Sequence, residues 1–185
     1  MTTLSAAKRS ARYGWLAIVC VMNACAAQPS ESQRAQTDAV ESLVKVFCDA
    51  WNKHDGHALA AIMAEDVDFV NVGARWFHGR RDFETYHTRL LSGRFASSTT
   101  GALEVRTRFI RSDLAAIHWS WWIKGDKDFD GTPRPERFGV MTLLAEKRGE
   151  RWQVVVAQNT NLIPGAAPEE EGIASPIPMP DASAR

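Results

Sequence analysis

Two histidines are the clearest candidates for acid–base chemistry in this chain. His87 lies in residues 80–91, where Phe83 and Leu90 share its face of a predicted helix. His118 lies in the middle of a predicted strand. Because the charge of an imidazole changes near neutral pH, either side chain could donate or accept a proton in a pocket. The alternative for His87 is a buried histidine that a single hydrogen bond satisfies.

Tryptophans next to His118 offer a wall for a flat apolar ligand. Alternation along residues 117–122 puts His118, Ser120 and Trp122 on one face of the strand and three apolar side chains on the other. The alternation leaves open which face lines a pocket, and aromatic residues serve equally in a core or in a sheet–sheet interface. We predict Trp122 and Trp76 as pocket walls, with core packing as the alternative for Trp76.

Three amides are candidates for binding and orienting a ligand. Asn71 lies near the end of the predicted strand over residues 67–72, and Gln158 and Asn159 follow an apolar run. Buried amides need hydrogen-bond partners, so these side chains either hold a ligand or brace the backbone. Asn71 can orient a ligand but cannot take a proton. Asp68 falls on the opposite face of its strand, where we expect a solvated or helix-capping carboxylate.

One acidic segment resembles a metal site without fitting one. Asp126, Asp128 and Asp130 copy the first half of a calcium-binding loop. The twelfth position, which needs a bidentate glutamate, is Arg137, and two prolines interrupt the loop. We therefore predict a solvated hairpin loop here and no metal. No glycine-rich nucleotide loop is found either, so no cofactor is predicted.

Composition favours one globular domain without a nucleic-acid partner. The chain has 185 residues, a hydrophobic fraction of 45%, and 22 basic against 22 acidic residues. The segment over residues 1–26 holds three basic residues and no acid, so the remainder carries 19 basic against 22 acidic. No basic block remains that would attract DNA or RNA.

The segment over residues 1–26 is typical of an export signal. Lys8, Arg9 and Arg12 precede an apolar run over residues 14–22, which is shorter than the roughly 20 residues that span a bilayer. A small-x-small cleavage pattern surrounds Cys25. Export to the periplasm is the prediction. The alternatives are a lipid anchor on Cys25 and an uncleaved N-terminal anchor.

Cys48 is the only cysteine beyond this segment, so no intrachain disulfide can form there. It shares a helical face with Val40, Val44, Phe47 and Trp51. We therefore predict a small buried hydrophobe rather than a reactive thiol.

The pattern along the chain predicts an α+β domain. A linker over residues 27–36 leads into a helix that starts near Asp38 and stops at Gly56. Residues 165–185 are expected to be a disordered tail. Helices followed by hairpin-linked strands favour a strongly curved antiparallel sheet wrapped around about three helices as a cone, over residues 37–164. Further helices are predicted at 57–64 and 80–91, and strands at 67–72, 103–110, 114–124, 138–146 and 152–163.

Short segments in this order resemble one family. They are AWNKHD at 50–55, AEDVDFVN at 64–71, WFHG at 76–79, His87, DLAAIH at 113–118, WQV at 152–154 and AQNTN at 157–161. The chain resembles the SnoaL-like members of the nuclear-transport-factor-2-like superfamily, and within them the SgcJ/EcaC group. The resemblance implies an internal pocket, a homodimer packed through the sheets and, for the subgroup, an oxidoreductase label. It matches His87 to a helical histidine of the family.

Two functions are compatible with these residues. The first is an exported protein whose pocket takes a small, partly apolar molecule, with acid–base chemistry by His87 or His118 and an orienting role for Asn71, Gln158 and Asn159. The second is a non-catalytic binding or dimerisation module of the same fold. A cavity that contains His87 and a second polar group favours chemistry, whereas a cavity filled by tryptophan favours the module.

Overall fold

The computed structural model describes residues 30–163. The expected export signal over residues 1–26, with Cys25, and the expected tail over residues 165–185 lie outside the described residues. In chain order the elements are α1 Glu31–Asn52, α2 Gly56–Ala60, β1 Met63–Val70, β2 Trp76–His78, α3 Arg80–Ser92, β3 Thr99–Arg111, β4 Leu114–Lys124, β5 Arg137–Arg148 and β6 Arg151–Asn161.

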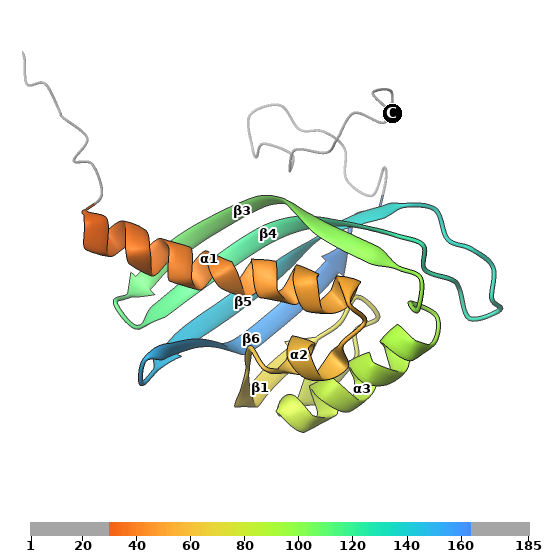
Figure 1. Ribbon diagram of the computed structural model, residues 1–185, viewed down its shortest axis with the longest axis horizontal. Helices are drawn as coiled ribbons and strands as arrows, with labels where there is room; N and C mark the ends of the chain where they lie inside the picture. The colour runs from red at the N-terminus through yellow and green to blue at the C-terminus, as the bar shows by residue number, and fades with distance from the viewer. Residues whose placement is uncertain (1–29, 164–185) are drawn as a thin grey trace, which may run out of the picture.

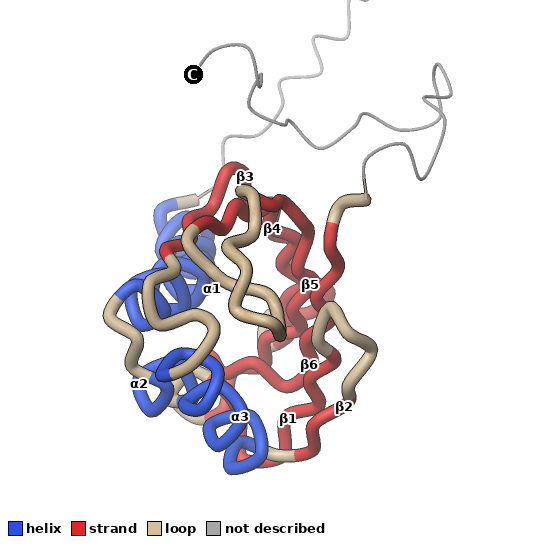
Figure 2. The backbone as a smooth tube through the Cα atoms, turned by 90° about the vertical axis from the view of Figure 1, so that its right-hand side faces the viewer, coloured by secondary structure: helices blue, strands red, loops and turns tan. Residues whose placement is uncertain are grey.

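The six strands form one curved, unclosed sheet with the helices on its concave side (Figures 1 and 2). The strand order is β2-β1-β6-β5-β4-β3. The expected α+β cone is therefore confirmed, with one correction, because β1 and β6 pair in parallel. The strands from β3 to β6 are antiparallel neighbours in chain order, so each reverses the direction of the one before it. The last of them, β6, then lies beside β1 and runs in the same direction as β1.

The first helix starts earlier than expected. Ser30 accepts a hydrogen bond from the backbone N–H of Gln33, whose side chain accepts from the backbone N–H of Ser30, so a capping box begins α1 well before Asp38. Residues 31–36 are thus helical rather than part of a linker. The apolar face packs into the core through Val40, Leu43, Val44, Phe47, Cys48, Ala50 and Trp51.

The end of α1 is fastened to the start of β3. Trp51 Nε1 donates to Ser98 Oγ at 3.0 Å, and Asn52 exchanges two hydrogen bonds with the backbone of Thr100. These hydrogen bonds fix α1 across the concave face.

α2 is shorter than expected and β1 begins earlier, because the parallel pairing of Met63 with Val154 already draws the chain into the sheet.

The register of β4 decides which face of the strand is inside. Trp119 pairs with Met141 of β5, and Ile117, Trp119 and Trp121 are buried on the concave face. His118 is exposed on the convex face. The question that alternation left open is therefore answered in favour of the three apolar side chains.

Cys48 is buried in the core beneath α1, as predicted. Burial raises the pKa of its thiol to about 11, so the thiol stays protonated at neutral pH. None of the helices within residues 30–163 is both long and apolar enough to cross a membrane.

Candidate functional site

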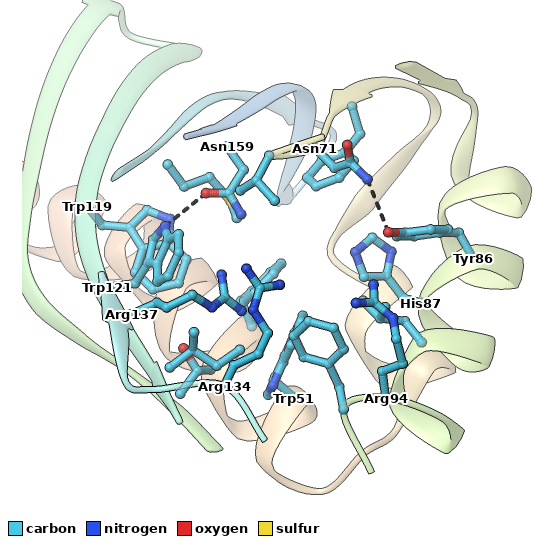
Figure 3. A pocket seen from close by; sticks show the side chains of 18 residues that line it. Trp51, Asn71, Tyr86, His87, Arg94, Trp119, Trp121, Arg134, Arg137 and Asn159 are labelled. Atoms are coloured by element: carbon cyan, nitrogen blue, oxygen red, sulfur yellow. Dashed lines mark hydrogen bonds between the residues drawn. The ribbon is translucent and has the colours of Figure 1, made fainter. Parts of the chain in front are cut away.

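The concave face of the sheet and the helices enclose a cavity of about 110 Å³, which we call the inner cavity (Figure 3). It opens into a wider hollow of about 850 Å³, the outer groove, and Asn71, Tyr86, Leu90, Arg94 and Arg134 line both. The apolar walls of the inner cavity include Phe47, Trp51, Phe69, Trp119, Trp121 and Met141.

His87 lies on the wall that α3 contributes. Its side chain is 3% exposed, and its Nδ1 donates to the carbonyl of Phe83 at 2.8 Å, which leaves Nε2 as an acceptor. The rings of Phe83, Tyr86 and Phe69 surround the imidazole at 3.9, 5.0 and 5.4 Å between centroids. Burial lowers the pKa of His87 to about 4, so the side chain is neutral at pH 7 and can accept a proton through Nε2.

Asn71 is held in one orientation at the end of β1. Its Oδ1 accepts from the backbone N–H groups of Gly73 at 2.9 Å and Arg75 at 3.0 Å, so this oxygen is committed to the turn. Its Nδ2 donates to the hydroxyl of Tyr86 at 3.1 Å. Because that hydroxyl receives this bond, its own proton is free to be donated toward a ligand.

A second amide is oriented from the opposite wall. Asn159 Oδ1 accepts from Trp121 Nε1 at 2.8 Å, so the amide nitrogen of Asn159 keeps its two N–H groups for other partners. Trp119 also lines the inner cavity, and its buried Nε1 has no hydrogen-bond partner within residues 30–163. The wall that holds Tyr86 and His87 therefore faces the wall that holds Trp119, Trp121 and Asn159 (Figure 3). Both walls carry hydrogen-bonding groups that have no partner among the contacts described above.

Three arginines also line the inner cavity. Arg137 Nη2 contacts Asp126 Oδ2 at 2.6 Å, and Arg134 Nε lies 3.9 Å from the same oxygen. Asp126 is 1% exposed, so the expectation of a fully solvated loop is wrong at this residue. The aspartate turns inward because the two guanidinium groups compensate its charge. Arg94 is the third, and its guanidinium lies over the ring of Phe129 at 4.0 Å.

The structure brings together only part of the predicted site. His87, Asn71 and Asn159 line the inner cavity, and the roles assigned to them remain predictions. His118 is outside it on the convex face, where Nδ1 lies 3.0 Å from Thr142 Oγ1. The strand period of two places it there, because its neighbours Ile117 and Trp119 occupy the core.

Trp122, Gln158 and Trp76 are also outside the inner cavity. Trp122 shares the convex face with His118, and Gln158 is exposed beside Asn159, which points the other way. Trp76 is 60% exposed on β2, where its Nε1 donates to Asp68 at 3.1 Å. Asp68 is thus a convex-face carboxylate that also lies 2.8 Å from His78 Nδ1.

Sequence reasoning missed Tyr86 and the arginines. Arg137 carries the one signal that was present, since it has the same parity along β5 as the buried Met141 and Leu143. A charged residue on the apolar face of a strand is uncommon unless it is paired or functional. Tyr86 gave no signal apart from its position beside His87. No group of three metal-binding side chains is found within the described part of the chain.

The fold and the site define a cone-shaped α+β protein with a cavity between a curved sheet and its helices. The family model described as "SnoaL-like domain" matches residues 44–155. The chain therefore belongs to the SnoaL-like domain family. No curated protein matches the chain.

Solved structures share this fold. An uncharacterised protein with a cystatin-like fold from Caulobacter vibrioides is 26% identical with a TM-score of 0.66, over 70% of this chain and 92% of that one. A hexachlorocyclohexane dehydrochlorinase, LinA type 2, is 17% identical with a TM-score of 0.62, over 76% and 97%. A candidate scytalone dehydratase from Novosphingobium aromaticivorans is 13% identical with a TM-score of 0.61, over 70% and 86%.

Proposed function

We propose that the protein binds a small, partly apolar molecule in the inner cavity and moves a proton on it, with His87 as the general base. The observation that carries the proposal is the neutral, buried imidazole of His87 on the wall of an aromatic cavity. The imidazole is already deprotonated at neutral pH, and because a pKa of about 4 makes it a weak base, the step also needs hydrogen bonds that raise the acidity of the ligand carbon.

The surrounding donors suit a reaction at a carbon beside a carbonyl group. In the proposed step, His87 Nε2 takes a proton from that carbon while the Tyr86 hydroxyl or the Asn159 amide donates a hydrogen bond to the ligand oxygen. The carbanionic charge then moves onto that oxygen. Return of the proton to another carbon completes an isomerisation, and loss of a leaving group completes an elimination.

The names of two structural neighbours support this class of reaction. Both names denote eliminations: a dehydrochlorinase removes hydrogen chloride and a dehydratase removes water. They are only 17% and 13% identical to this chain, so they indicate the type of chemistry the fold hosts rather than the substrate. The finer assignment to the SgcJ/EcaC group stays part of this proposal.

A non-catalytic binding module is the second candidate. It would be favoured if tryptophan side chains filled the pocket. Trp119 and Trp121 instead form one wall and leave the cavity of about 110 Å³ beside His87. This arrangement favours a catalytic pocket over a non-catalytic module whose pocket is filled by tryptophan.

We further propose that the protein is exported to the periplasm and forms a homodimer. Export rests on the basic and apolar pattern of residues 1–26, with a lipid anchor on Cys25 as the alternative. Dimerisation rests on the convex face of the sheet, where Trp122, Val140 and Leu144 are only half-buried. Half-buried apolar side chains at the centre of a sheet are typical of a surface that a second copy covers.

Proton exchange in heavy water tests the catalytic proposal directly. Ligands found by thermal shift would be incubated with the protein in D₂O, and exchange at carbons next to a carbonyl would be followed by NMR. We expect His87→Gln to slow exchange by roughly 10²-fold or more, since a positioned base contributes about that much. His118→Gln is the matched control on the convex face and should exchange as fast as the wild type. Equal rates for all three proteins would exclude His87 as the base.

A further inference from the structure

We propose that the ligand of this pocket is an acid: one apolar ring that carries a carboxylate or a similar small anionic group, bound by Arg134 and Arg137. The inference rests on the proposed function, since it names the ligand class of the same pocket. It goes beyond it because neither the fold nor the general-base chemistry requires a charged ligand.

The lining of the inner cavity carries an excess of positive charge. Arg134 and Arg137 share one carboxylate, Asp126, which is 2.6 Å from Arg137 and 3.9 Å from Arg134. No aspartate or glutamate of residues 30–163 is among the side chains that line the inner cavity. The two guanidinium charges at the cavity are therefore balanced only in part by this carboxylate, in a chain whose formal net charge is zero. Charges in such a setting are normally paired.

Two residues that line the inner cavity carry a buried hydrogen-bond donor without a partner in residues 30–163. The buried Nε of Arg137 and the buried Nε1 of Trp119 both have no hydrogen-bond partner within the described chain. Buried donors are nearly always satisfied, so these two leave the polar side of the site incompletely paired, as does the buried Asp126 Oδ1, an acceptor without a partner in the same part of the chain. A carboxylate fits best, because its two oxygens match the planar fork of a guanidinium group. Figure 3 shows the heads of Arg134 and Arg137 directed into the middle of the pocket.

The outer groove, through which a ligand would approach, is also mainly positive. Within residues 30–163, the side chains that line the outer groove include Arg75, Arg89, Arg94 and Arg134 against a single acid, Asp82. A concave surface lined mainly by one sign of charge concentrates ligands of the other sign. The entrance therefore favours an anion before it reaches the arginine pair.

The size and lining of the inner cavity indicate the rest of the ligand. Phe47, Trp51, Phe69 and Met141 make its inner wall apolar. An apolar cavity of about 150 Å³ holds benzene. The inner cavity, at about 110 Å³, is smaller, so one ring is the largest apolar group that it takes, and the polar substituent must lie toward the outer groove. In this pose the ring lies within the aromatic walls and the acid lies on the arginines.

Calorimetric titration of the full chain with four probes tests the inference. The probes are benzoate, its neutral isostere benzamide, phenyl phosphate, and acetate as an acid without a ring. We expect benzoate or phenyl phosphate to bind about tenfold or more tightly than benzamide, with acetate much weaker. Raising the salt concentration should weaken the binding of the anionic probes only. The stronger of the two ring acids identifies the anionic group.

Variants locate the binding of the acid. Arg134→Gln should weaken benzoate binding roughly tenfold and leave benzamide unchanged, and Arg134→Lys should restore part of the loss. Arg108→Gln is the matched control, because Arg108 is an exposed arginine on the convex face. Arg137 is tested together with its partner as Asp126→Asn/Arg137→Gln, so that no buried charge is left alone; this pair should also weaken benzoate.

The outcomes separate this inference from the proposed function. Equal affinities for benzoate and benzamide would overturn the ring-acid assignment and leave a pocket for neutral molecules. Acetate that binds as tightly as benzoate would also overturn it, because the arginines would then hold any small anion. Failure of every ring compound to bind, charged or neutral, would count against the inference and against the proposed function together.

Discussion

At the scale of single residues, the neutral state of His87 is a consequence of where α3 places it. Aromatic rings surround the imidazole, and the one strong polar contact is the carbonyl of Phe83. Within residues 30–163, no carboxylate is among the groups that shift its pKa toward the protonated form. The cost of burying a charge therefore dominates, and the lowered pKa follows from it.

This environment predicts a loss of stability in acid. The pKa of His87 falls from 6.5 to about 4 on folding, so between these values the unfolded chain binds a proton that the folded protein does not. The part of the free energy of unfolding that depends on a neutral His87 is fully present above pH 6.5 and is lost progressively as the pH falls to about 4. At about 1.4 kcal/mol for each pKa unit, it amounts to roughly 3 kcal/mol. Urea unfolding between pH 4 and 7.5 measures it.

His87→Phe isolates this contribution from the carboxylates, which also titrate in acid. Phenylalanine fits an aromatic surrounding and has no proton to gain, so the variant should lose less stability than the wild type between pH 6.5 and 4. A variant whose stability falls as steeply as that of the wild type would show that His87 is not the group responsible.

At the scale of elements, the pocket depends on how closely α3 lies against α2. Gly56 is the contact point, because a Cβ added there would come within 2.3 Å of Thr88 Oγ1 and 2.8 Å of the Thr88 backbone. The missing side chain at Gly56 thus sets the distance between the two helices. It thereby places Tyr86, His87 and Leu90 against the sheet.

Gly56→Ala should therefore push α3 outward. We expect a loss of about 1–3 kcal/mol in the free energy of unfolding, as is usual for overpacking, together with weaker ligand binding. Chemical denaturation and calorimetry measure the two effects. Gly73→Ala is the control, since a Cβ there meets only Asn71 Oδ1 at 3.4 Å. If Gly56→Ala were as stable as this control, the close approach would not be limiting.

At the scale of the whole molecule, the curved sheet separates the surface of the proposed ligand site from the surface of the proposed dimer contact. The concave face holds the core and the inner cavity. The convex face carries His118, Trp122 and Leu144 in the centre of the sheet. Because each strand contributes alternately to both faces, substitutions can test the proposed ligand binding and the proposed subunit contact independently.

Light scattering after size exclusion tests the proposed dimer. The wild type should elute with twice the mass of one chain, and Leu144→Glu should elute as a folded monomer, because a carboxylate on the convex face would be buried on dimerisation. Val46→Glu is the control, as Val46 is an exposed apolar residue of α1. A wild-type protein with the mass of one chain at high concentration would contradict the proposal.

Local patterns in the sequence were enough for most of the fold. The apolar period along residues 40–51 specified a helix with one buried face, and alternation specified the long strands β3 to β6. The start of α1 was misplaced because Ser30 forms a capping box with Gln33, a local signal that competes with the one at Asp38. The parallel pairing of β1 with β6 joins strands far apart in sequence, so no local pattern contains it.

The site divides in the same way. The sequence by itself determined that His87 shares the apolar face of its helix and that His118 and Trp119 lie on opposite faces of their strand, because helical and strand periods fix the direction of neighbouring side chains. Only the tertiary structure decided which strand face is concave, and so removed His118, Trp122 and Gln158 from the pocket. It also brought the arginines of the β4–β5 loop and the start of β5 opposite α3. That meeting depends on the curvature of the whole sheet, which no short stretch of sequence specifies.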